Sequence, residues 1–183
     1  MSVTPEQVQR IYEEADCLFS REAVERAIEQ MAAAISDELA QKDPLILAVM
    51  SGAMIPAGVL LTHLDFPLQI DYIHASRYRG DTAGGELEWR VAPRFPLKGR
   101  CVLVIDDILD EGLTLQAIID TCRKKGASEV HSAVLVKKRH ERNIGIEADY
   151  VGLEVEDRYV FGYGMDYKEY LRNAPGIFAV RGS

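Results

Sequence analysis

Short apolar runs and amphipathic stretches alternate along this chain. Between residues 20 and 40 the apolar side chains recur at helical spacing, at Val24, Ala27, Ile28, Met31, Ile35 and Leu39. This spacing predicts a helix with one buried face, for which Ser20 is the N-cap. Apolar runs of strand length follow at residues 45–50, 68–75, 87–91, 101–105, 130–136, 150–155 and 176–180. Further helices are predicted at residues 55–64 and from about Leu113, and a first helix begins behind Thr4-Pro5.

This alternation of strands and helices predicts an α/β fold, with a mostly parallel central sheet flanked by helices. The chain has 183 residues, enough for one full core, so we expect a single domain over residues 1–183. Ligands of such sheets bind beyond the carboxyl ends of the strands, which is where we expect the functional residues.

Charge and composition indicate which kinds of molecule this chain can bind. The formal net charge is −8, from 29 acidic and 21 basic residues, and an acidic chain is a poor general binder of nucleic acid or anionic membrane. The N-terminal stretch lacks the apolar core of a signal peptide, and no apolar run approaches membrane-spanning length. The three cysteines have no paired spacing, which favours thiols in a reducing compartment. We therefore expect a cytoplasmic protein that binds small molecules.

The most informative stretch is VLVIDDILDEGLT at residues 102–114. An apolar strand runs directly into Asp106 and Asp107, and a glycine-containing turn then leads into a helix. Paired carboxylates suit vicinal hydroxyls, directly or through a divalent cation. The helix amides beside a glycine suit a phosphate. Together these features predict a sugar-phosphate site. The alternative is a helix start made acidic to match its dipole, which does not account well for two acids directly against a buried strand.

This stretch resembles the signature of type I phosphoribosyltransferases, enzymes that bind phosphoribosyl pyrophosphate (PRPP). The resemblance implies their fold, with a small hood formed by N-terminal helices in residues 4–40 and by residues 157–183. It implies that Asp106 and Asp107 hold the ribose hydroxyls. It also implies that the loop around the 5′-phosphate consists of Asp110, Glu111, Gly112, Leu113 and Thr114.

Two later stretches resemble hypoxanthine-guanine phosphoribosyltransferases. SAVLVK at residues 132–137 resembles the strand whose final lysine, here Lys137, contacts the purine 6-oxygen. Residues 157–172 resemble the purine-binding segment, in which Tyr159 stacks on the base and the Val160 backbone meets its edge. The resemblance further implies that Asp166 helps to bind the purine and holds Mg²⁺, and that Arg172 contacts the pyrophosphate. A lysine donates but cannot accept hydrogen bonds, so it favours a 6-oxopurine over a 6-aminopurine.

Asp110 occupies the family's position for a carboxylate near the imidazole edge of the base. This makes Asp110 the candidate general base. A hydrogen-bond acceptor that only stabilises charge is the alternative, and the sequence leaves both open.

Two further segments complete the expected site. Residues 76–85 predict a lid loop, and Ser76 and Tyr78 resemble the family's serine–tyrosine pair there. Ser51-Gly52 follows the first apolar run, where much of the family has a lysine before the glycine of a pyrophosphate-binding turn. The turn amides remain available for pyrophosphate, but the fixed positive charge is missing.

The function expected from these residues is Mg²⁺-dependent purine salvage, in which hypoxanthine or guanine and PRPP yield IMP or GMP and pyrophosphate. The alternatives are an enzyme that prefers xanthine and a regulatory nucleic-acid-binding protein that keeps the PRPP fold. By analogy with the family, we expect a homodimer or homotetramer.

Overall fold

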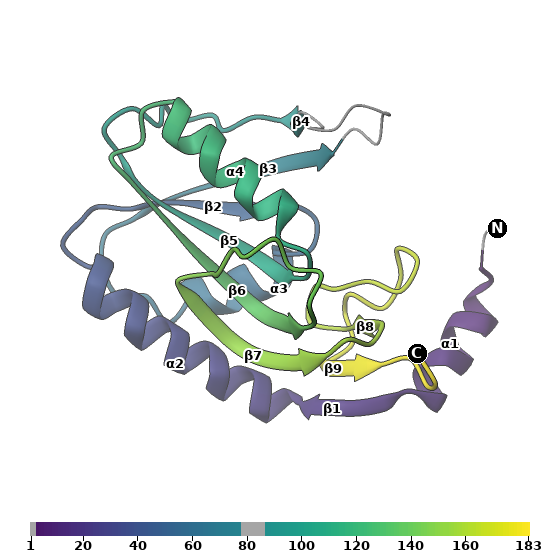
Figure 1. Ribbon diagram of the computed structural model, residues 1–183. Coiled ribbons are helices and arrows are strands. Elements are labelled where there is room, and N and C mark those ends of the chain that lie inside the picture. The colour runs from purple at the N-terminus through teal and green to yellow at the C-terminus, as the bar shows by residue number, and fades with distance from the viewer. Residues whose placement is uncertain (1–2, 78–86) are drawn as a thin grey trace.

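A six-stranded sheet forms the centre of the computed structural model, which describes residues 3–77 and 87–183 (Figure 1). Its spatial order is β4-β3-β2-β5-β6-β7. The strands are β2 (Leu45–Val49), β3 (Gln69–Arg77), β4 (Leu87–Val91), β5 (Cys101–Leu109), β6 (Glu129–Arg139) and β7 (Tyr150–Glu156). All pair in parallel except β4, which runs antiparallel to β3. This arrangement confirms the predicted α/β class with a mostly parallel sheet.

Helices cover both faces of this sheet. They are α2 (Arg21–Leu39), α3 (Met54–Leu61) and α4 (Leu113–Lys124), while α1 (Pro5–Glu14) lies beside the hood. The chain steps from β2 to β3 in one direction and from β5 to β6 in the other, so right-handed crossovers place α3 and α4 on opposite faces. All five residues of β2 are buried, as a central strand covered on both faces requires.

A second, three-stranded sheet forms the hood beyond the carboxyl ends of the central strands (Figure 1). Its order is β1-β9-β8, with β1 (Asp16–Ser20), β8 (Val160–Phe161) and β9 (Gly176–Ala179). The expectation of helices alone in residues 4–40 is therefore incomplete, because β1 lies between α1 and α2. Only its pairing with β9, from the other end of the chain, gives this short segment its strand conformation.

Local capping explains where the first two helices begin. The Thr4 side chain accepts from the Gln7 amide at 3.3 Å, and the Gln7 side chain accepts from the Thr4 amide at 2.9 Å. The Ser20 hydroxyl accepts from the Ala23 amide at 3.4 Å. These bonds satisfy amides that the helix itself leaves unpaired, and both predicted N-caps are confirmed.

The cysteines are unpaired. Cys101 and Cys122 are buried, whereas Cys17 is exposed. Burial raises the pKa of the Cys122 thiol to about 11, so Cys122 stays protonated and serves as an apolar packing residue. Within residues 3–77 and 87–183, no helix is both long and apolar enough to cross a membrane.

Candidate active site

The paired acids lie on β5, which continues past the predicted strand end at residue 105 to Leu109. Burial raises the pKa of Asp106 well above its ordinary value, and the neighbouring Asp107 carboxylate raises it further. Burial also raises the pKa of Asp107, against the opposing effects of a hydrogen bond to Asp106 and the charge of Arg172. Two neighbouring carboxylates with raised pKa values are stabilised by a bound cation or by hydroxyl groups that donate hydrogen bonds to them. The pair therefore suits either kind of ligand.

The Ser51-Gly52 turn lies directly against this pair. In the sheet register Ala48 of β2 pairs with Ile105 of β5, so the residues after β2 run beside Asp106 and Asp107. A Cβ atom on Gly52 would lie 2.1 Å from the Asp107 Oδ2 atom. A larger residue at this position would therefore displace the Asp107 carboxylate, because the turn backbone approaches it closely.

The C-terminal segment closes over the same turn. A Cβ atom on Gly164 would lie 2.0 Å from the Gly52 carbonyl oxygen. Arg172 donates to the Gly164 carbonyl at 2.8 Å and pairs with Asp166 at 2.9 Å. Asp166 also accepts from the Glu169 amide at 2.8 Å. The structure thus brings Gly164 to the Gly52 turn and the charge of Arg172 to Asp107, and Asp166 lies beside them through its pair with Arg172.

The predicted phosphate loop leads from β5 into α4. Gly112 is the N-cap residue, with φ of 87°, and no side-chain hydrogen bond from the described residues caps the helix. The side chain of Ile146 packs on Gly112 so closely that a Cβ atom there would lie 2.1 Å from its Cγ2 atom. The amides at the start of α4, around Leu113 and Thr114, remain free of side-chain caps and can hold an anion.

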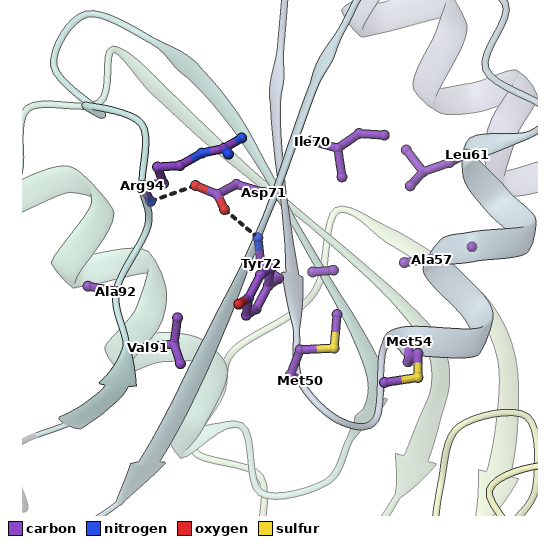
Figure 2. A pocket seen from close by; sticks show the side chains of 12 residues that line it. Met50, Met54, Ala57, Leu61, Ile70, Asp71, Tyr72, Val91, Ala92 and Arg94 are labelled. Atoms are coloured by element: carbon purple, nitrogen blue, oxygen red, sulfur yellow. Dashed lines mark hydrogen bonds between the residues drawn. The ribbon is translucent and has the colours of Figure 1, made fainter.

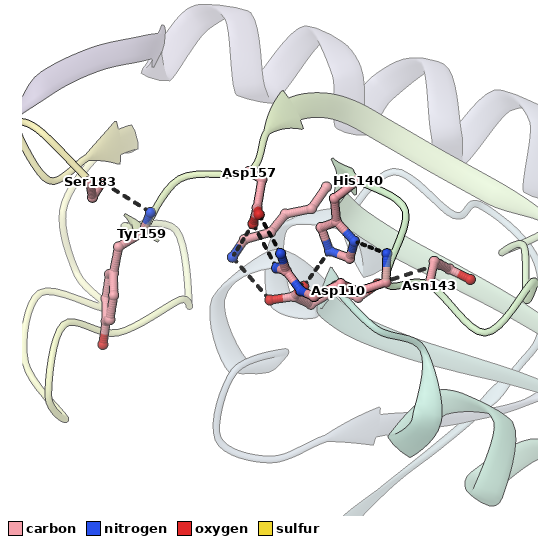
Figure 3. A network of polar contacts seen from close by, with 8 residues as sticks. Asp110, His140, Asn143, Asp157, Tyr159 and Ser183 are labelled. Atoms are coloured by element: carbon pink, nitrogen blue, oxygen red, sulfur yellow. Dashed lines mark hydrogen bonds and ion pairs between the residues drawn. The ribbon is translucent and has the colours of Figure 1, made fainter.

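Asp110 is the centre of a polar network (Figure 3). Its Oδ2 atom accepts from Lys138 Nζ at 2.9 Å, and its Oδ1 atom lies 2.5 Å from His140 Nε2. Burial by itself raises the pKa of Asp110, but the hydrogen bonds and charges of Lys138 and His140 outweigh it and hold the pKa below its ordinary value. Asp110 is therefore an ionised carboxylate and a weak base.

Asp157 joins this network from the end of β7. It receives two hydrogen bonds from the Arg142 guanidinium, at 2.6 and 2.9 Å, and lies 3.9 Å from Lys138 Nζ. The Arg142 pair lowers the pKa of Asp157. A two-point bond of this kind fixes orientation as well as charge, so it tethers the segment after β6 to the end of β7.

The structure places Lys138, rather than Lys137, beside Asp110. Leu109 pairs with Lys137 in the β5–β6 register, and successive side chains of a strand point to opposite faces. Lys138 accordingly reaches Asp110 with a side chain only 12% exposed, whereas the Lys137 amine pairs with Glu147. Lys138, His140 and Asp157 are not among the site residues predicted from the sequence. The sequence does contain one indication of Lys138. Lys137 and Lys138 are consecutive at the end of a strand, and only one of two successive side chains can face the site.

The remaining predicted residues lie in the hood, in β3 or outside the described residues. Tyr159 is 44% exposed and packs edge-on against Tyr167, with ring centroids 5.5 Å apart. Val160 is buried in β8 and pairs with Ala179. Ser76 belongs to β3, while Tyr78 and most of the predicted lid lie outside the described residues, so the lid stays a prediction.

The repulsion between the Asp106 and Asp107 carboxylates should lower the stability of the folded protein at high pH. We expect Asp106→Asn, in buffer with EDTA at pH 8, to raise the free energy of unfolding by about 1 kcal/mol, because it removes one of two neighbouring like charges at a partly buried position. A raised carboxyl pKa destabilises the fold above the unfolded pKa and not below it. The gain should therefore vanish near pH 4. Urea unfolding at both pH values, with exposed Asp65→Asn as the control, measures this, and unchanged or lower stability at pH 8 would contradict it.

An apolar hollow of about 420 Å³ lies beyond Met50, the residue before the Ser51-Gly52 turn (Figure 2). Its lining includes Met50, Met54, Ile70, Tyr72 and Val91. Met54 is 61%, Ile70 52% and Tyr72 49% exposed. It contains none of the predicted site residues, and such a concentration of exposed apolar side chains is typical of a contact surface.

Comparisons with known proteins point to one family. Residues 14–169 match the family described as phosphoribosyl transferase domain. Hypoxanthine-guanine phosphoribosyltransferase of Bacillus subtilis (strain 168) is 34% identical over 161 residues, covering 87% of this chain and 89% of that protein. Hypoxanthine-guanine-xanthine phosphoribosyltransferase of Tritrichomonas foetus is 32% identical, covering 87% and 88%. A crystal structure of a hypoxanthine phosphoribosyltransferase from Staphylococcus aureus matches with a TM-score of 0.88 at 27% identity, covering 94% of this chain and 95% of that one.

Proposed function

Because this chain belongs to the phosphoribosyl transferase domain family, we propose that it is a purine salvage enzyme that converts hypoxanthine or guanine and PRPP to IMP or GMP and pyrophosphate. The family resemblance drawn from the sequence is confirmed. The observation that carries the choice of base is the Lys138–Asp110 pair beside the acidic end of β5. The regulatory alternative is not favoured, since the matched relatives bear enzyme names.

Lys138, a hydrogen-bond donor, lies next to Asp110, an acceptor, and this pair matches the 6-oxygen and the ring N–H on the imidazole side of a 6-oxopurine. In this proposal the Lys138 ammonium donates to the 6-oxygen, and Asp110 accepts from the ring N–H. A 6-amino group offers the lysine only donors, so adenine is excluded. The exposed Tyr159 ring supplies an aromatic face on which a planar base can stack. A contact between the base and the Val160 backbone remains part of the proposal.

PRPP is assigned to the remaining groups. Asp106 and Asp107 take the ribose hydroxyls, and the amides of residues 111–114 with the Thr114 hydroxyl take the 5′-phosphate. The Ser51-Gly52 turn and Arg172 take the pyrophosphate, because an arginine fork matches a phosphate geometrically. Arg172 has to exchange its contacts with Asp166 and Gly164 for the ligand.

The donors also fit Mg²⁺, which prefers hard oxygen ligands. Asp106 and Asp107 are neighbouring carboxylates whose pKa values are raised, so they would hold the cation, and its charge would reduce the repulsion between them. Asp166 offers a further carboxylate, although both of its oxygen atoms now accept hydrogen bonds or ion pairs. When bound, Mg²⁺ would neutralise the negative charge of the leaving pyrophosphate.

The reaction is displacement of pyrophosphate from ribose C1 by a purine nitrogen. Positive charge develops on the ribose and on the incoming base as the bond forms, and a carboxylate held ionised stabilises it. The lowered pKa of Asp110 favours this charge-stabilising, hydrogen-bond-accepting role over that of a strong general base.

The direct test is pyrophosphate release from PRPP and Mg²⁺ with hypoxanthine, guanine, xanthine, adenine and uracil offered separately. We expect turnover with hypoxanthine or guanine and none with adenine or uracil. Turnover mainly with xanthine would change the substrate assignment alone. Absence of turnover with every base would overturn the proposed function.

The two neighbouring lysines give a sharper test of base recognition. We expect Lys138→Met to lower kcat/KM for hypoxanthine by about tenfold to a hundredfold, because a charged hydrogen bond to the base is lost. Lys137→Met, which removes an amine paired with Glu147, should lower it by less than about twofold. Initial rates over a range of hypoxanthine concentrations give kcat/KM for each variant and show which lysine contacts the base. The reverse ranking would return the purine contact to Lys137, as predicted from the sequence.

The proposal includes a homo-oligomer, with the apolar hollow as the contact between copies (Figure 2). A single copy leaves Met54, Ile70 and Tyr72 in water, and a two-fold contact would bury the same face on both subunits. We expect Ile70→Glu to shift the mass measured by light scattering toward the monomer. An unchanged mass would place the contact elsewhere.

The unpaired cysteines support a cytoplasmic location.

A further inference from the structure

Both ring nitrogens of His140 are engaged inside the active-site network (Figure 3). Its Nε2 atom lies 2.5 Å from Asp110 Oδ1, and its Nδ1 atom accepts from the Arg142 amide at 3.1 Å. The side chain is only 5% exposed. An imidazole that is hydrogen-bonded at both nitrogens and almost fully shielded from solvent cannot rotate without breaking two hydrogen bonds.

These contacts determine which nitrogen carries the proton. A backbone amide can only donate, so Nδ1 has to be the unprotonated nitrogen. The neutral ring then carries its proton on Nε2, where it points at the Asp110 carboxylate. His140 is thereby a directed hydrogen-bond donor to one oxygen of Asp110, while Lys138 contacts the other oxygen.

We infer that His140 is a positioning residue for Asp110: its Nε2–H holds one carboxylate oxygen and so fixes the other toward Lys138 and the purine. This inference rests on the proposed function. His140 does not touch the substrate in this arrangement. It acts by holding Asp110 in one rotamer, since misplacing a catalytic group by even about 1 Å can lower a rate a hundredfold.

A separate ion pair holds His140 itself in place. The amide that fixes the tautomer belongs to Arg142, and the Arg142 guanidinium is bound at two points by Asp157. The chain of contacts therefore runs from Asp157 through Arg142 and His140 to Asp110, linking the end of β7 to the end of β5. Asn143 adds a hydrogen bond from its side chain to the Asp110 carbonyl, at 3.3 Å.

The charged groups around Asp110 determine its response to pH. Lys138 of β6 and Arg142, at 3.8 Å from Asp110 Oδ1, favour the ionised carboxylate. Asp157 and Glu111 bring negative charge to the same region, but Arg142 offsets both. Loss of the His140 donor leaves Asp110 with one less hydrogen bond to its charged form, which raises its pKa. The acid limb of the kcat/KM profile should then move to higher pH.

The experiment combines a measurement of the tautomer with kinetics. Imidazole ¹⁵N spectra of the whole protein at pH 8 report the protonated nitrogen of each of the four histidines, and His140→Gln assigns the His140 signal by its disappearance. We expect His140 as the fixed Nε2–H form, perturbed by Asp110→Asn. A ring that averages between tautomers, or one protonated on Nδ1, would overturn the inference without any assay of activity.

The kinetic arm uses two substitutions of different chemistry. Gln keeps an amide donor near the position of Nε2, whereas Phe keeps the ring volume and removes the donor. We expect His140→Phe to lower kcat at least about tenfold with the purine KM changed less than about threefold, and His140→Gln to recover most of kcat. The matched control is His63→Gln, at an exposed position after α3, which should behave as wild type.

The outcomes separate the two proposals. Wild-type turnover together with an unchanged kcat and an unshifted acid limb in His140→Phe would overturn the role of His140 and leave the proposed function standing. No turnover by wild type with any base would overturn the proposed function, and the positioning role with it. If His140→Phe does not fold, the tautomer of His140 in the wild-type protein still decides, because that measurement needs no variant with altered activity.

Discussion

We expect kcat with hypoxanthine or guanine to fall by about 10²-fold or more when Asp110 is replaced by Asn. Asn has nearly the same shape, so the substitution removes the charge and one acceptor while the fold is kept. Lys138 and His140 then face a neutral amide, and the positive charge that develops on the base has no carboxylate to stabilise it. Initial-rate kinetics with saturating PRPP measure the change.

Asp120→Asn is the control for this substitution. Asp120 lies on α4 and accepts from the Gln116 side chain at 3.0 Å, a contact that an Asn oxygen can keep. It should retain full activity. If Asp110→Asn kept more than about a third of wild-type kcat, the carboxylate would not be the group that stabilises the transition state.

The second large effect is expected from Gly164→Ala. Gly164 has φ of 109°, a conformation that L side chains rarely adopt. A Cβ atom there would lie 2.0 Å from the Gly52 carbonyl oxygen and 2.9 Å from Pro56 Cδ. Backbone strain and steric overlap should together lower the free energy of unfolding by at least about 2 kcal/mol. Activity should fall too, because the overlap pushes the C-terminal segment away from the Ser51-Gly52 turn.

Gly58→Ala is a matched control, because the same atoms are added within α3 at a position that is exposed in a single copy of the chain, on the lining of the apolar hollow. No atom lies within 4 Å of a Cβ on Gly58, and alanine is favoured over glycine inside a helix by roughly 0.5–1 kcal/mol. Urea unfolding should therefore show the two substitutions acting in opposite directions. Equal stability of Gly164→Ala and wild type would mean that the segment does not pack on the turn as described.

Much of the site could be predicted from the sequence because its chemistry is local. The acids at residues 106–107 and the glycine turn into α4 come from one continuous stretch of chain. A strand followed by a helix needs only neighbouring residues to place carboxylates and amides at the same edge. The N-caps Thr4 and Ser20 were predictable for the same reason, since a cap bonds to amides three residues away.

Contacts between distant segments could not be read in this way. His140 lies on a different strand end from Asp110, and nothing in either local pattern indicates that their side chains meet. Lys138 rather than Lys137 faces Asp110 because the β5–β6 register decides which of two successive residues points into the site. The short segment Asp16–Ser20 is a strand because β9 lies beside it.

The sequence by itself determined the α/β class, the strand that carries the paired acids and the loop that leads into α4. These depend on the periodicity of burial and on backbone propensities, which act over a few residues. The tertiary structure alone decided which cations surround Asp110, which nitrogen of His140 faces it, and that Gly164 packs on Gly52. These depend on packing between segments far apart in the chain, where one position in register changes the face on which a side chain lies.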